Sequence, residues 1–366
     1  YATVRMKQGE AFIRGGSYTN RFGTAYSYGI YARGGSLSVQ GENTSFTSVA
    51  DGVCIRCTKE GDAAPSLNIE NGSFTSYNGD TVQVNGGTMT VNSGTFTKSG
   101  AGVGDTKTAI IHMENGTLDA KGSADANGKK SIQMTCAAST GTLSNVFGVY
   151  SEGGTVSLQN AQITVNGTSS AGVLAEEEGS KVILQSVSIG LSGAQSGGEI
   201  TSAAVNTLGG SITLSGTNQI SSDGFGITAA ADVSITGGTT TVGSEGAMLP
   251  TTAIYIFGGS LSVSTGAELS VYAEIDENLK WAGYDDSTNS YQYDGVQVNG
   301  GTLESNGTLN VTFTGLSNDA FESGDTYLTQ QIKSYAVRVL NAEDVTICVG
   351  KITNLVGGGV YVGGGT

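Results

Sequence analysis

The sequence is short of cysteine, of basic residues and of long apolar runs, and each shortage excludes a class of protein. Four cysteines in 366 residues cannot form the dense disulfide framework of a small secreted domain. Only 17 lysines and arginines oppose 32 acidic residues, and at a net charge of −15 we expect no nucleic-acid partner. No apolar run reaches the length of roughly 18 residues that a membrane-spanning helix needs, so we expect no membrane insertion.

The sequence also lacks a recognisable catalytic arrangement. Histidine occurs once, as His112, so a Ser-His-Asp triad has a single candidate base, and no nucleophile elbow is present. A glycosidase needs two facing carboxylates, but the acidic runs Glu176–Glu178 and Asp285–Asp286 both fall in predicted turns. Cys54 and Cys57 form a single CxxC without a second pair, which favours structural cysteines over a zinc site. We therefore predict a non-enzymatic protein without metal or cofactor.

Glycine, in contrast, is abundant at 58 residues and lacks the three-residue period of collagen. The glycines punctuate a repeat in which Val-x-Val leads to Gly-Gly-Ser/Thr and then to Leu-x-Val. The best copy covers residues 295–303, with echoes at 81–89 and 253–261. Period-two alternation points one set of side chains inward, and glycine tolerates the positive φ that corners require.

Each repeat predicts three short strands, and the chain as a whole predicts an all-β fold, a right-handed parallel β-helix of about 12 coils. We expect a single domain over residues 1–366, with loop insertions near 119–130, 272–293 and 315–334. The second insertion carries the only tryptophan, Trp281. We align the first inward residue of strand one at Ile30, Val53, Val82, Ile111, Val149, Val173, Val205, Ile227, Ile254, Val296, Val337 and Val360.

The outward residue after each of these positions forms one stripe, which includes Cys54, Leu174 and Thr228. The other members are candidate glycan ligands, because tyrosine rings stack on sugars and polar side chains hydrogen-bond them. The alternative is that tyrosine simply suits an exposed strand. The candidates are Tyr31, Gln83, His112, Tyr150, Asn206, Tyr255, Gln297, Arg338 and Tyr361.

The Gly-Gly-Ser/Thr-Leu-x-Val alternation with its Asn-Gly-Thr turns resembles the β-helical stalks of bacterial surface adhesins and autotransporter passenger regions. This resemblance implies an extracellular structural protein at the cell surface, a stalk or a filament subunit, with surface glycans or host proteins as partners. Unpaired strand edges at the ends of a β-helix also predict self-association end to end.

The predicted fold is also similar to pectate lyases and polygalacturonases. That similarity gives the alternative function, a carbohydrate-binding or polysaccharide-degrading β-helix. The His-Gly motif of polygalacturonases is missing, because His112 is followed by Met113. The similarity therefore extends to the structural residues of the coils and leaves the catalytic ones unmatched.

Overall fold

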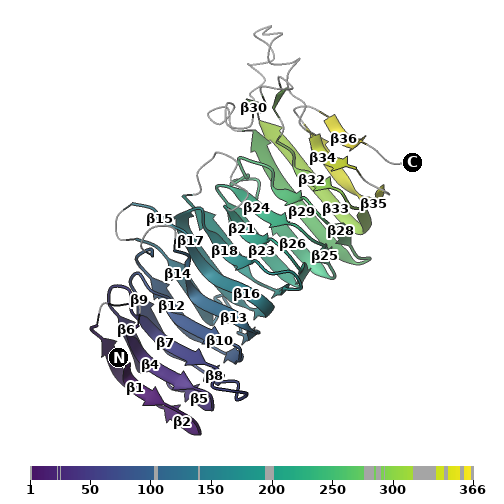
Figure 1. Cartoon of the computed structure of the whole chain (residues 1–366). Helices are drawn as coiled ribbons and strands as arrows, with labels where there is room; N and C mark the ends of the chain where they lie inside the picture. The colour runs from purple at the N-terminus through teal and green to yellow at the C-terminus, as the bar shows by residue number, and fades with distance from the viewer. Residues whose placement is uncertain are drawn as a thin grey trace. The chain divides into compact units, whose positions relative to one another are not determined.

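The computed structural model describes the chain except residues 1, 23, 25, 103–105, 139–140, 194–201, 276–283, 286–289, 292, 316–334, 342–344, 355–357 and 364–366. The described residues form two compact units, Tyr1–Gly193 with Leu208–Gly210 (unit 1) and Ala194–Thr207 with Ser211–Thr366 (unit 2). Each unit is a right-handed parallel β-helix, which confirms the predicted fold class (Figure 1). No helix in the described part of the chain could span a membrane. The expectation of a single domain stays a prediction.

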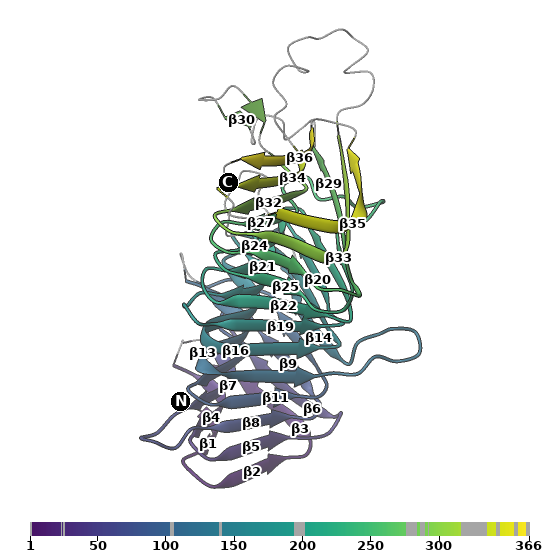
Figure 2. The same cartoon turned by 90° about the vertical axis from the view of Figure 1, so that its right-hand side faces the viewer.

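Unit 1 consists of three ladders of parallel strands, and each coil contributes one strand to each ladder (Figure 2). The strand-one ladder contains β1 (Ala2–Met6), β4 (Tyr28–Arg33), β7 (Val53–Thr58), β10 (Val82–Asn85), the first parts of β13 (Thr108–Lys121) and β16 (Val146–Gln159), and β18 (Ala171–Ala175). The strand-two ladder contains β2 (Glu10–Ile13), β5 (Ser36–Val39), β8 (Ser66–Ile69), β11 (Thr88–Val91), the second parts of β13 and β16, and β19 (Lys181–Gln185). The strand-three ladder contains β3 (Gly16–Asn20), β6 (Thr44–Ser48), β9 (Ser73–Ser76), β12 (Gly94–Lys98), β14 (Ile132–Cys136), β17 (Ala161–Thr168) and β20 (Ser188–Ser192), and the short β15 (Leu143–Ser144) pairs with the end of β17.

Unit 2 has the same three ladders. Its strand-one ladder contains β21 (Ala203–Thr207), β24 (Phe225–Ala229), β27 (Ile254–Ile256), β32 (Val296–Asn299), β34 (Tyr335–Leu340) and β36 (Gly358–Gly363). Its strand-two ladder contains β22 (Ser211–Ser215), β25 (Val233–Ile235), β28 (Leu261–Val263) and the first parts of β33 (Leu303–Gly315) and β35 (Val345–Asn354). Its strand-three ladder contains β23 (Thr217–Ser222), β26 (Gly238–Val242), β29 (Ala267–Ile275) and the second parts of β33 and β35, while β30 (Tyr284–Asp285) and β31 (Ser290–Tyr291) form a separate antiparallel pair.

The strand-one ladder shows how alternation builds the core. In β10, Val82 and Val84 are fully buried, whereas Gln83 between them is only partly covered. Ile55 and Ile111 pair with Val82 from the two neighbouring coils. Burial of each such side chain contributes about 1.5–3 kcal/mol. Each coil therefore gains its stability from contact with the coils next to it.

The predicted register is confirmed at the three valines aligned in unit 2. Val296 pairs with Val337, and Val337 pairs with Val360. The described residues contain seven strand-one segments in unit 1 and six in unit 2, one more than the 12 predicted. The additional coil begins at β1, where Val4 pairs with Ile30.

An aromatic ladder fills the core beneath strand three of unit 1. The rings of Tyr18, Phe46, Phe74 and Phe96 stack coil upon coil, with centroid separations of 4.7, 5.6 and 4.8 Å. Phe74, in the middle, is fully buried. Offset aromatic stacking adds about 0.5–1.5 kcal/mol per pair to the burial of the rings.

The loop insertions fall partly outside the described residues. Near 119–130, β13 continues to Lys121 and an excursion follows that a bridge between Ala124 and Lys130 closes. Near 272–293, β29 extends to Ile275, but Trp281 lies outside the described residues. Most of the predicted insertion at 315–334 also lies outside them.

Candidate functional site on the strand-one face

The outward residues of strand one lie in register from coil to coil in both units. In unit 1 the pairing joins Arg5, Tyr31, Arg56, Gln83, His112, Tyr150 and Leu174. In unit 2 it joins Asn206, Thr228, Tyr255, Gln297, Arg338 and Tyr361. We call each set the strand-one stripe of its unit. The nine candidates all occupy stripe positions.

One predicted member of the stripe is wrong. Ile55, not Val53, pairs with Val82, so Arg56 takes the outward position and Cys54 is fully buried. The physical reason is that a slip of two residues preserves the alternation of inward and outward side chains. The hydrophobic pattern alone therefore cannot separate the two alignments.

Only part of the stripe is open to solvent. The buried members are Asn206, Thr228, Tyr150, Leu174, Arg338 and His112, with exposed fractions of 0%, 0%, 4%, 4%, 8% and 9%. Tyr31, Gln83, Tyr255 and Gln297 are half-buried, and Tyr361 is 40% exposed. A sugar ring could stack only on the accessible members, and glycan binding by the candidates stays a prediction.

A buried lysine holds the turn that carries Asp80. Lys98 ends β12, and its Nζ donates hydrogen bonds to the carbonyl oxygens of Tyr77, Asn78 and Gly79 at 3.3, 2.5 and 2.8 Å. Burial lowers the pKa of Lys98 to about 8, although the Asp80 carboxylate acts in the opposite direction. The three bonds fix the turn and so fix the place of Asp80.

Asp80 in turn orients the only histidine. Its Oδ1 accepts a hydrogen bond from the backbone N–H of Ala109 at 2.7 Å, and its Oδ2 lies 2.9 Å from Nδ1 of His112. Nε2 of His112 lies 3.2 Å from Oε2 of Glu152. Burial alone would lower the pKa of His112, but hydrogen bonds and charges from Asp80 and Glu152 outweigh burial and raise it to about 9. The ring bridges two carboxylates from different coils.

Tyr150 covers this bridge from the next coil. Its ring stacks on His112 with centroids 4.7 Å apart, and its hydroxyl lies 2.7 Å from Glu152 Oε1 and 2.6 Å from Glu176 Oε2. Burial raises the pKa of Tyr150, and the two carboxylates raise it further, so the hydroxyl stays protonated. Lys107 forms an ion pair with Glu176 and places its Nζ 5.4 Å from the centre of the Tyr150 ring.

Glu114 completes the cluster. It lies in register with Glu152 of the following coil. Its Oε1 accepts a hydrogen bond from Gln83 at 2.7 Å, and its Oε2 accepts one from Asn85. Candidate ligand atoms of His112, Glu114 and Glu152 all lie within 4.8 Å of one another. One imidazole with two carboxylates is a donor set that divalent transition-metal ions bind.

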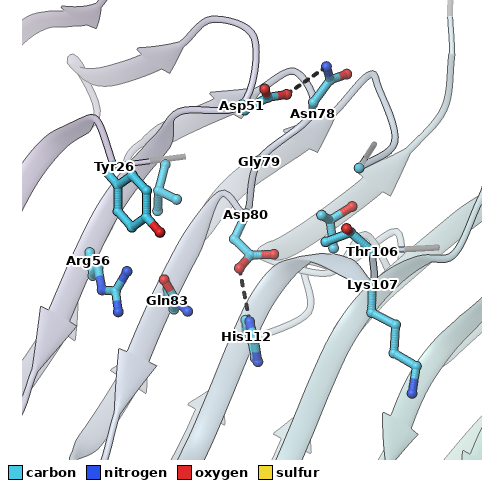
Figure 3. A pocket seen from close by; sticks show the side chains of 13 residues that line it. Tyr26, Asp51, Arg56, Asn78, Gly79, Asp80, Gln83, Thr106, Lys107 and His112 are labelled. Atoms are coloured by element: carbon cyan, nitrogen blue, oxygen red, sulfur yellow. Dashed lines mark hydrogen bonds and ion pairs between the residues drawn. The ribbon is translucent and has the colours of Figure 1, made fainter. Parts of the chain in front are cut away.

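A pocket of about 390 Å³ opens beside His112. Figure 3 shows Asp80 and His112 between Tyr26 and Arg56 on one side and Lys107 on the other. Nη1 of Arg56 donates a hydrogen bond to the Tyr28 hydroxyl at 3.1 Å. The volume of this pocket suits a small ligand or a terminal sugar. The lining residues are Tyr26, Asp51, Val53, Arg56, Asn78, Gly79, Asp80, Gln83, Gly102, Thr106, Lys107, Thr108 and His112.

Unit 2 contains the same corner with arginine in place of histidine. Asp294, like Asp80, lies two residues before the first inward valine of its coil. Its Oδ1 accepts a hydrogen bond from the Tyr335 N–H at 2.8 Å, and its Oδ2 lies 2.9 Å from Nε of Arg338. Burial raises the pKa of Asp294 to about 7, although Arg338 acts to lower it.

Both oxygens of Asp80 and both ring nitrogens of His112 have partners in this arrangement. Of the acidic run Glu176–Glu178, only Glu176 joins the site, and the other two are exposed in a turn. Asp286, of the second run, lies outside the described residues.

The sequence pattern missed most of the residues around His112. Asp80, Lys98, Lys107 and Glu152 were not expected at the site, and of these only Asp80 has a sequence signal. That signal is the shared Asp-x-Val-Gln-Val-Asn-Gly-Gly-Thr of residues 80–88 and 294–302. Lys107 comes from a segment without regular structure, where periodicity gives no information.

Three cysteines lie in the interior of the described part of the chain. Cys54, Cys57 and Cys136 are free and buried, and burial raises the pKa of each thiol to about 12. The CxxC pair therefore lies in the core of β7.

Comparisons with protein-family models, with curated proteins and with solved structures find no match for this chain.

Proposed function

We propose that the chain is a non-enzymatic structural β-helix of the bacterial cell surface, a stalk of the adhesin type or a filament subunit. The observation that supports this most is the coil-to-coil pairing of the described strands within each unit, with fully buried valines and isoleucines stacked in the strand-one ladder. A stack of this kind holds its side chains at fixed spacings, which suits a spacer. A net charge of −15 favours solubility.

Antibody labelling of the cells that produce the chain tests the location. Labelling of intact cells is expected. Labelling only after permeabilisation would contradict an extracellular role. Electron microscopy across a range of protein concentrations tests the filament alternative, which isolated particles at every concentration would exclude.

Carbohydrate binding is the second candidate function, and the pocket beside His112 favours it. The exposed ring of Tyr26 offers a stacking surface, while Arg56 and Asn78 offer planar hydrogen-bonding groups. Sugars are recognised by this combination of one aromatic face and several converging polar groups. Host or bacterial surface glycans would be the ligands.

A glycan array with two matched tyrosine variants tests this binding. Tyr26→Ala is expected to abolish retention, because Tyr26 lines the pocket and is 77% exposed. Tyr77→Ala is the control, since Tyr77 is 52% exposed and is not among the lining residues. Failure of the wild-type chain to retain any glycan, or equal loss in both variants, would rule out the pocket.

A further inference from the structure

Two carboxylates of the strand-one face lie opposite each other on adjacent strands. Glu114 in β13 pairs in register with Glu152 in β16. Like charges directly opposite on neighbouring strands repel. A third carboxylate, Glu176 from the next coil, approaches the same Tyr150 hydroxyl as Glu152 and forms an ion pair with Lys107. A positive charge placed between Glu114 and Glu152 would relieve the repulsion between them.

The imidazole beside these carboxylates is held as a metal-binding histidine is held. Asp80 Oδ2 faces Nδ1 of His112 at 2.9 Å, and a hydrogen bond from Ala109 fixes Asp80 itself. An Nδ1–H donated to a carboxylate directs Nε2 toward the metal position, as in carboxylate–histidine–zinc arrangements, and a bound metal ion would replace the proton between Nε2 and Glu152. Nε2 points toward Glu152.

The two carboxylates are also supported from behind. Gln83 and Asn85 donate hydrogen bonds to the two oxygens of Glu114, and the Tyr150 hydroxyl lies 2.7 Å from Oε1 of Glu152. Each oxygen keeps a second lone pair for a metal ion. Ligands held in this way need little reorganisation on binding.

We propose that His112, Glu114 and Glu152 bind one Zn²⁺ ion, with Asp80 orienting the histidine. Three protein ligands leave the fourth tetrahedral position for water or an exogenous ligand. His112 also lines the pocket, whereas Glu114 and Glu152 do not. This assignment is independent of the structural role and of the carbohydrate-binding candidate.

The donor set selects zinc over the alkaline-earth ions. Ca²⁺ and Mg²⁺ take oxygen ligands, and Ca²⁺ takes six to eight of them, whereas Zn²⁺ accepts imidazole nitrogen with carboxylate oxygen in a site of four. The described cysteines do not compete, because three are buried and the exposed one, Cys348, lies in unit 2.

Isothermal titration calorimetry with Zn²⁺ tests the site, in a Cys348→Ser background that removes the exposed thiol. One ion per chain is expected. Glu152→Gln and Glu114→Gln should each weaken binding by more than about 100-fold, and Asp80→Asn by about 10- to 100-fold, as for a supporting carboxylate. Glu178→Gln, an exposed glutamate in the same unit, should bind as the parent does.

Absorption spectroscopy at the zinc edge keeps the test valid if a variant fails to fold by circular dichroism. The parent chain with one equivalent of Zn²⁺ should show nitrogen and oxygen ligands and no sulfur. No zinc binding by the folded parent, sulfur in the ligand shell, equal affinity of the Glu152→Gln and Glu178→Gln variants, or tighter binding of Ca²⁺ than of Zn²⁺ would each overturn the proposal.

Discussion

Replacement of Arg338 by methionine is expected to destabilise unit 2 strongly near neutral pH. Asp294 has no exposed side-chain surface, and apart from its hydrogen bond from Tyr335 the described partner of its carboxylate is Arg338. Removing one partner of a buried ion pair leaves an uncompensated charge, which costs about 3–5 kcal/mol of unfolding free energy. Methionine keeps the length and apolar character of the arginine stem, so lost packing contributes little.

The loss of unfolding free energy caused by Arg338→Met should be larger above about pH 7 than below it. Burial raises the pKa of Asp294 to about 7 in the folded chain, against about 3.9 in an unfolded one. Because the folded carboxyl holds its proton more tightly than the unfolded one, protonation stabilises the fold at pH values below the unfolded pKa. This contribution is lost as the pH rises through about 7. At about pH 5 the folded carboxyl is neutral, and Arg338→Met should then remove only a hydrogen bond of about 1 kcal/mol.

Urea unfolding of the wild type and the variant at about pH 5 and about pH 8, followed by circular dichroism, measures both costs. The double variant Asp294→Asn with Arg338→Met should recover most of the loss at the higher pH, because no charge remains buried. Equal costs at the two pH values, or a loss below about 1 kcal/mol at about pH 8, would refute the reasoning.

Three further predictions concern unit 1. Phe74→Ala should cost about 3–5 kcal/mol in urea unfolding, because it removes a buried ring and both of its stacking contacts; a loss below about 1 kcal/mol would contradict the aromatic ladder. Lys98 has a folded pKa of about 8, below the unfolded value of about 10.4. The unfolding free energy of the wild type relative to Lys98→Met should therefore rise from about pH 8 to about pH 10. A free-energy difference that does not change with pH would argue against a buried charge. Gly154→Ala should lower the free energy of unfolding by more than about 1 kcal/mol, because Gly154 has a φ of +89° and a Cβ there would lie 2.0 Å from the Gly116 oxygen. An unchanged melting temperature would exclude this strain.

The coil register could be read from the sequence because two signals coincide. Inward valines alternate with polar residues, and paired glycines mark the corner that follows, as in residues 81–89 and 295–303. Together they placed Val296 beneath Val337 and Val337 beneath Val360, as the structure confirms. Where the second signal is absent, as after Thr58, the alignment slipped by two residues and put Cys54 in the place of Arg56.

The site was only partly predictable. Gln83, His112 and Tyr150 followed from the stripe, because register alone decides their position. The burial of His112 and Tyr150 could not follow from it, since it depends on partners such as Lys107 that irregular segments supply. The alternation of inward and outward residues also does not predict which carboxylates lie close together on neighbouring coils. The proximity of Glu114 and Glu152 to His112 gives this cluster its chemistry.

The most direct test of the account is a pair of distances along one ladder of unit 1. Phe12, Asn68 and Ile183 are outward residues on strand two, and the pairing sets Ile183 six coils from Phe12 and four from Asn68. With a rise of about 4.8 Å per coil, the backbone separations should be about 29 and about 19 Å. Double electron–electron resonance between spin labels on cysteines at residues 12 and 183, and at 68 and 183, in a Cys348→Ser background, measures both. Two narrow distributions that differ by about 10 Å are expected; broad distributions, or equal distances for the two pairs, would contradict a stacked β-helix.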